Sequence, residues 1–185
     1  MTVRPLALAG LILLAALSRL LPHPPNFAPI TALAVFGAVR YADRRAALLA
    51  PLLALFTSDL AREILYRYGL ADQWGLYRGM WVVYGTTALI ALMARLAQGT
   101  RSLVVLAGTT LAGSCLFFVA TNFAVWAAGS LYPPTAEGLA ACYAAAVPFF
   151  RNALFGDAFY ATALFGAWAM AEARVPALRP AAAGA

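Results

Sequence analysis

The sequence predicts an all-α integral membrane protein, a single domain over residues 1–185 that folds as a bundle of six transmembrane helices. Hydrophobic residues make up 64% of the chain and charged residues only 11%, whereas a soluble domain has about 25% charged residues. The apolar residues fall into six runs, and arginines stand at the ends of these runs. So large an apolar excess requires lipid as the solvent.

The six predicted helices lie at about 5–21, 27–41, 46–65, 79–97, 102–128 and 148–172. A helix rises about 1.5 Å per residue, so a span needs about 20 residues. The second run is short and follows Pro29, and we expect it to cross incompletely or at the edge of a pocket. The first run resembles a secretory signal with a cleavage site at Ala16-Leu17-Ser18, but Arg19 and the prolines behind it favour a retained helix.

The arginines predict the orientation of the bundle. All 13 basic residues are arginines, and the net charge is +6. Six spans place eight arginines on the side of the two termini (Arg4, Arg40, Arg44, Arg45, Arg95, Arg101, Arg174 and Arg179). Five fall on the other side (Arg19, Arg62, Arg67, Arg78 and Arg151). Arginine-rich loops stay in the cytoplasm, so both termini are predicted to be cytoplasmic. The arginines are scattered, which does not indicate a nucleic-acid partner.

The links on the predicted outer side are long and rich in aromatic and polar residues. They are LPHPPNFAP, REILYRYGLADQWGLYRG and GSLYPPTAEGLAACYAAAVP. Loops of this length often bind ligands. Prolines stiffen the first link in an extended form, which would present His23 and Asn26 at the mouth of a cavity. The alternative is a simple turn whose histidine faces water.

Polar side chains at membrane depth point to a shared cavity on this side. They are Asp59 in the third helix, Asn122 in the fifth, and Arg151, Asn152 and Asp157 in the sixth. An ionised group in the membrane costs at least about 2.5–3.5 kcal/mol and therefore needs a reason. Each also has a structural explanation: Asp59 can pair with Arg62, Asn122 can join helices, and Arg151 can extend toward water. Asp157 lies deeper and needs an interior partner.

From these patterns we expect a set of substrate-binding residues and no catalytic ones. The candidates are His23, Asn26, Asp59, Arg78, Met80, Tyr84, Asn122, Trp126, Tyr143, Asn152 and Asp157. The chain has no Walker A, HExxH or GxSxG motif, so ATP hydrolysis and the corresponding protease and esterase chemistries are not expected. One histidine and two distant cysteines, Cys115 and Cys142, predict no metal site. Both cysteines are expected to be small buried hydrophobic residues.

Several strings resemble a bacterial family of small six-helix proteins related to the substrate-binding S-components of energy-coupling factor (ECF) vitamin transporters. They are RLLPHPPNFAPITALAVFG, LLAPLLALFTSDL, GMWVVY and GSCLFFVATNFAVWAAGSLYPPTAEGLAACYAAAVPFFRNALFGDAFYATALFG, between about Arg19 and Gly166. The resemblance, which extends to solitary S-components for cobalamin, implies a bundle in the bacterial inner membrane that binds a vitamin from outside. It also implies an ECF coupling subunit and ATPases as partners of some members.

The resemblance makes cobalamin or a related corrinoid the leading ligand, as a substrate and not as an intrinsic cofactor. Cobalamin-type members can use a cysteine before the fourth helix as a cobalt ligand, and this chain has LYRGMWVVY there. Met80 and His23 are therefore only weak candidates as cobalt ligands. Two other functions stay open at this point: a small intramembrane enzyme or cofactor-modifying binder, and an accessory subunit that packs in a larger membrane complex.

Overall fold

The structure is a computed structural model that describes residues 3–129 and 131–179, and this part of the chain contains six α-helices and no strand. The helices are α1 (Val3–Leu17), α2 (Ile30–Arg40), α3 (Arg44–Arg67), α4 (Met80–Ala94), α5 (Leu103–Ala127) and α6 (Ala136–Arg174). Short 3-10 turns follow three of them, at Ser18–Leu20, Arg95–Ala97 and Pro176–Leu178. The predicted all-α class is confirmed.

Four helical segments are long and apolar enough to cross a membrane by length and composition. They are Val3–Leu20, Met80–Ala97, Leu103–Ala127 and Ala136–Arg174. The other two helices differ from them in distinct ways. α3 has 24 residues but carries charged side chains near both of its ends. α2 is apolar but has only 11 residues, which is too short for a full span.

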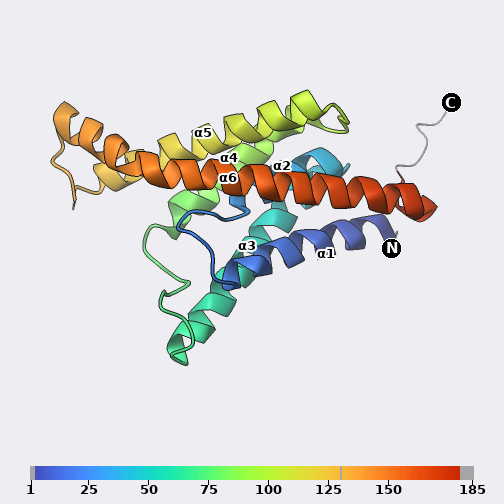
Figure 1. Ribbon diagram of the computed structural model, residues 1–185, viewed down its shortest axis with the longest axis horizontal. Coiled ribbons are helices and arrows are strands. Elements are labelled where there is room, and N and C mark those ends of the chain that lie inside the picture. Colours follow the sequence, from blue (N-terminus) through green and yellow to red (C-terminus); the bar gives the residue numbers. More distant parts are fainter. Residues whose placement is uncertain (1–2, 130, 180–185) are drawn as a thin grey trace.

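Successive helices run in alternating directions, which gives the molecule two distinct ends (Figure 1). The terminal end holds the start of α1, the α2–α3 and α4–α5 links and the end of α6. The cavity end holds the α1–α2, α3–α4 and α5–α6 links. Toward the cavity end α3 diverges from α5 and α6, and the links 21–29 and 68–79 enter the resulting wedge. The eight arginines predicted to share a side belong to the terminal end.

The centre of the bundle is α2, which the other five helices contact. Every residue from Thr31 to Val39 is buried, as expected for a helix that is hydrophobic all round. Close packing requires small residues: a Cβ on Gly37 would lie 2.7 Å from the Pro51 ring of α3. The carbonyl end of α2 is held by Arg95, which donates to the carbonyl oxygens of Ala38 (3.1 Å) and Tyr41 (2.7 Å).

Two predicted helix starts are wrong. The second helix begins at Ile30 and not at residue 27, because the loop that carries Pro29 continues up to the helix. The sixth begins at Ala136 and not at residue 148, so most of the third predicted outer link is helical. Pro148 removes one backbone hydrogen bond without ending the helix. The hydroxyl of Thr135 accepts from Gly138 N–H (3.1 Å) and caps the true start.

A network around the buried Glu172 joins segments at the terminal end. Its carboxylate accepts hydrogen bonds from Arg4 (2.8 Å), Arg101 (2.9 Å) and the Trp168 indole (2.8 Å). Arg4 also donates to the Leu178 carbonyl and lies over the Trp168 ring. These contacts connect α1, the α4–α5 link and α6.

Candidate functional site

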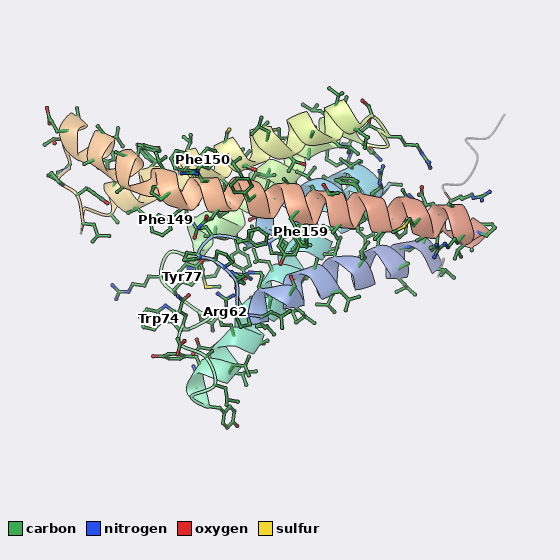
Figure 2. The ribbon with its side chains drawn as sticks, in the orientation of Figure 1. Arg62, Trp74, Tyr77, Phe149, Phe150 and Phe159 are labelled. Atoms are coloured by element: carbon green, nitrogen blue, oxygen red, sulfur yellow. The ribbon has the colours of Figure 1, made fainter. Side chains whose placement is uncertain are left out.

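A cavity of about 1030 Å³ opens in the wedge at the cavity end. Its walls come from the 3-10 turn after α1, the starts of α2 and α4, the outer halves of α3, α5 and α6, and the links 21–29 and 68–79. Figure 2 shows Arg62, Trp74 and Tyr77 on one side of this space and Phe149 of α6 on the other. The cavity is therefore built by segments from almost the entire chain.

One wall of the cavity contains a buried ion pair between the 3-10 turn after α1 and α3. Arg19 Nη1 lies 2.7 Å from Asp59 Oδ1, and their side chains are only 8% and 3% exposed. Arg19 Nη1 also donates to the Ser58 hydroxyl at 2.5 Å. The second oxygen of Asp59 accepts from the Tyr84 hydroxyl at 2.7 Å. Asp59 thus has a partner on each of its oxygens, as a carboxylate in a low-dielectric site requires.

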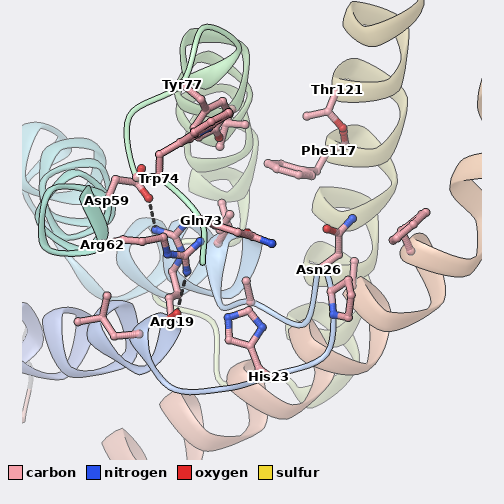
Figure 3. Close-up of a pocket in the computed structure, with 18 of the residues that line it drawn as sticks. Arg19, His23, Asn26, Asp59, Arg62, Gln73, Trp74, Tyr77, Phe117 and Thr121 are labelled. Carbon is pink, nitrogen blue, oxygen red and sulfur yellow. Dashed lines mark hydrogen bonds and ion pairs between the residues drawn. The ribbon is translucent and has the colours of Figure 1, made fainter. Parts of the chain in front are cut away.

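A second arginine stands beside this pair. Arg62 is half-buried, lines the cavity and donates from Nη2 to the backbone carbonyl of Arg19 at 2.7 Å. Figure 3 places the two guanidinium groups next to each other, with Asp59 behind them and Gln73 and His23 on the open side. The alternative in which Asp59 pairs with Arg62 is wrong, because Arg19 occupies the carboxylate.

The link 68–79 is fastened onto α3 and covers this wall. Glu63 accepts from the backbone N–H groups of Gly75 and Leu76, both at 3.2 Å. Gly75 lies so close to α3 that a Cβ there would come within 1.8 Å of the Asp59 carbonyl oxygen. Tyr77 follows in the cavity wall, and burial raises the pKa of its phenol. Tyr77 therefore faces the cavity as a neutral hydroxyl group.

The floor of the cavity is the amino end of α2 together with Asp157 of α6. Asp157 is buried and accepts from the Ser114 hydroxyl of α5 at 2.6 Å. The neighbouring Gly156 packs against the segment just before α2, because a Cβ on it would lie 3.1 Å from the backbone nitrogen of Ala28. Thr31, in the first turn of α2, lines the same cavity. Ser114 therefore gives Asp157 the interior partner that the sequence required.

The opposite wall is aromatic with a few polar groups. Phe117 and Phe118 of α5 and Phe149 and Phe150 of α6 line it, and Phe118 stacks on Phe150 with ring centroids 4.4 Å apart. Asn122 lies in the same wall and donates from its amide nitrogen to the Phe118 carbonyl at 2.8 Å. Asn122 thus bonds within its own helix instead of joining two helices.

Comparison with family models identifies the relationship of the chain. A model described as a family of unknown function, DUF6580, matches residues 1–178. The chain belongs to the DUF6580 family. Comparison with curated proteins and with solved structures finds no match.

In this DUF6580 protein the cavity brings together five of the eleven residues predicted from the sequence. His23, Asn26, Asp59, Asn122 and Asp157 line it. Two others support its walls. Tyr84 bonds to Asp59, and Asn152 donates to the Pro25 carbonyl at 3.0 Å, which fixes the proline-rich link on α6.

The other four predicted residues do not line the cavity. Arg78 is exposed, and Met80 is buried at the start of α4. Trp126 donates to the Pro133 carbonyl (3.0 Å) and Tyr143 to the Val119 carbonyl (2.8 Å), so both tie α5 to the start of α6. These tyrosine and tryptophan side chains use their polar ends to satisfy backbone groups.

Sequence reasoning omitted several residues that shape the cavity, above all Arg19, Arg62 and Gln73. Arg19 was considered only as a charge and as a reason for a retained first helix, and Arg62 only as a charge and as a possible partner of Asp59. The sequence did contain a signal for both arginines. Each lies within one helical turn of the outer end of an apolar run, where a cavity-lining residue is expected. Gln73 carries no comparable signal, since its position depends on how the link 68–79 folds back onto α3.

Metal ligands and thiols do not gather at the cavity. Among the described residues no group of three His, Cys, Asp or Glu side chains could hold a metal ion. Cys142 is buried, with its Sγ 3.5 Å from the Asn122 carbonyl oxygen, as expected. Cys115 is exposed on α5, which corrects the prediction that it is buried. Neither cysteine lines the cavity, so no nucleophilic thiol faces it.

Proposed function

We propose that this protein is a multi-pass protein of the bacterial inner membrane that binds a vitamin-like small molecule for uptake, as ECF S-components do. The observation that carries the proposal is the cavity of about 1030 Å³ between α3, α5 and α6. Ligand sites commonly measure about 300–1,000 Å³ and combine apolar walls with a few polar groups. A cavity at the upper end of this range suits a large ligand, and cobalamin or a related corrinoid is the first to test.

The position of the cavity supports uptake from outside. It opens at the end opposite to the two termini, while the terminal end carries the larger group of arginines. With the arginine-rich end in the cytoplasm, the cavity faces outward. Coupling to an ECF subunit and ATPases is part of the same proposal and rests on the resemblance described above.

The proposal is tested with protein purified from cells grown with cobalamin, by its absorption spectrum and by the shift of its unfolding temperature on adding cobalamin. Ala153→Trp introduces a bulky ring into the cavity, because Ala153 lines it on α6. Ala158→Trp makes the same change at an exposed position on the same helix and serves as the control.

We expect bound corrinoid in the wild type and in Ala158→Trp, and none in Ala153→Trp. A colourless wild-type protein whose unfolding temperature does not respond to cobalamin would remove corrinoids as the ligand. Equal binding by the two tryptophan variants would show that the ligand occupies another place.

A further inference from the structure

We propose that the cavity selects ligands that carry an anionic group, a carboxylate or a phosphate, and that Arg62 binds this group. The inference rests on the proposed binding function and names the chemical class of its ligand. In one wall two arginines, Arg19 and Arg62, lie beside a single acid, Asp59. Both oxygens of Asp59 are already engaged, one by Arg19 and one by Tyr84.

Arg62 therefore has no carboxylate partner among the described residues. A guanidinium has five N–H donors arranged as a fork, and Arg62 uses Nη2 on the Arg19 carbonyl. The rest of the guanidinium borders the cavity. A half-buried cation next to a second cation is stabilised by an anion that enters the same space. The planar fork suits the two oxygens of a carboxylate or phosphate.

The acids that line the cavity do not take this role. Asp157 lies at the floor, where the Ser114 hydroxyl donates to it. Asp72 is exposed in the link 68–79 and forms no ion pair among the described residues. Arg62 is thus the charged group of this wall that is left for a ligand, and the neutral amide of Gln73 points into the same space (Figure 3).

The rest of the ligand follows from the wall opposite. Phe117 faces the arginines across the hollow in Figure 3, and Phe118 and Phe150 continue the aromatic surface. Aromatic side chains favour flat, partly apolar rings. The ligand class that fits both walls is an organic anion that contains a ring. Its charged group would bind Arg62, and its ring would pack against α5 and α6.

A matched pair of probes tests this inference without knowledge of the natural ligand. Phenyl phosphate carries a ring and an anion, whereas benzyl alcohol carries a similar ring without charge. Binding of each is titrated by NMR to the wild type, Arg62→Gln, Arg62→Lys and Arg151→Gln in detergent. Arg151 is exposed on α6 and outside the cavity, so its variant controls for the loss of one positive charge.

We expect the wild type and Arg151→Gln to bind phenyl phosphate more tightly than benzyl alcohol. Arg62→Gln should weaken phenyl phosphate about tenfold or more, in line with hydrogen bonds to charged groups, and leave benzyl alcohol unchanged. Arg62→Lys keeps the charge but not the fork and should fall between them. If Arg62→Gln does not fold, the Arg62→Lys titration decides.

Equal affinity for the two probes in the wild type, or unchanged phenyl phosphate binding in both Arg62 variants, would overturn the inference. This failure differs from failure of the uptake proposal. A protein that binds cobalamin but shows no preference for phenyl phosphate keeps the proposed function and loses the anion site. A protein that ignores cobalamin but binds phenyl phosphate through Arg62 loses the corrinoid and keeps the anion site.

Discussion

The two ends of the molecule use the same chemistry to opposite effect. Each end has one buried acid held by arginine and by an aromatic donor: Glu172 with Arg4 and Trp168, and Asp59 with Arg19 and Tyr84. At each end the arginines outnumber the acid. At the terminal end the network joins the helices, and a pocket of only about 310 Å³ lies away from it between α3 and α4. The cavity end encloses about 1030 Å³.

The difference lies in what the additional arginines bind. At the terminal end three of them donate to backbone carbonyls: Arg40 to Thr100 (2.7 Å), Arg95 to Tyr41 (2.7 Å) and Arg179 to Glu172 (3.0 Å). Carbonyl groups that end helices or lie in links need such donors. At the cavity end Arg62 lines the cavity and has one hydrogen bond among the described residues, to the Arg19 carbonyl. The arginines of the terminal end therefore join segments of the chain, whereas Arg62 keeps donors for a ligand.

Substitution of Asp59, the paired acid of the cavity end, should cause the largest loss of stability. Asp59→Ala leaves Arg19 buried without its counter-ion, and breaking such a pair costs about 3–5 kcal/mol of unfolding free energy. Chemical unfolding in detergent measures the loss. The double variant Arg19→Met/Asp59→Ala removes the buried charge as well and should recover part of it. An Asp59→Ala protein as stable as the wild type would show that water solvates Arg19.

Glu172→Gln applies the matching change to the terminal end and should cost less, about 1.5–3 kcal/mol. The reason is exposure: the side chains of its partners Arg4 and Arg101 are 21% and 68% exposed, so water can solvate the charges that are released. The same unfolding experiment measures the loss, and phenyl phosphate binding should not change. A loss of binding equal to that of Arg62→Gln would mean that the two ends are not independent.

Gly75→Ala tests whether the link 68–79 belongs to the cavity wall. The added Cβ meets the backbone of α3, so we expect the link to lift away, at about 1 kcal/mol of unfolding free energy because the strain is relieved locally. Phenyl phosphate binding should fall, as NMR titration would measure. Gly79→Ala is the control, because its Cβ meets only the Tyr77 ring at 3.7 Å. Equal binding by both variants would remove the link from the site.

Arg67→Ala should have the smallest effect. Arg67 forms an i,i+4 pair with Glu63 at 2.9 Å, but its side chain is 72% exposed. Exposed pairs contribute little to stability, so unfolding should show no measurable change. A large loss would mean that the pair orients Glu63 on the N–H groups of Gly75 and Leu76, and the surface of α3 would then belong to the construction of the cavity.

The sequence predicted what depends on local composition. Apolar runs located the helices, and arginines at their ends sorted correctly into the two ends of the bundle. The polar residues Asp59, Asn122 and Asp157 could be connected to one space because each stands deep in an apolar helix on the same side. These inferences need only helix periodicity and the cost of polar groups in lipid.

What failed depends on distant contacts. Arg62 is three residues from Asp59 and is its obvious partner by sequence, yet Arg19, 40 residues away, occupies the carboxylate. Asp157 is 43 residues from Ser114, and the partner of this buried carboxylate depends on how α5 and α6 pack. Pro148 resembles a helix boundary, but the helix passes through it. One sequence carries no information on which distant groups meet.

The short length of α2 determines how deep in the membrane a bound ligand would lie. Eleven residues of helix measure about 16 Å, roughly half of the 30 Å hydrocarbon layer. In a bundle that crosses the bilayer, a molecule resting on Thr31 and Asp157 would already have travelled about half of the way through. Beyond it would lie α2, whose carbonyl end is held by Arg95. Passage to the other side would then require a displacement of this short helix and not a separation of full-length transmembrane helices.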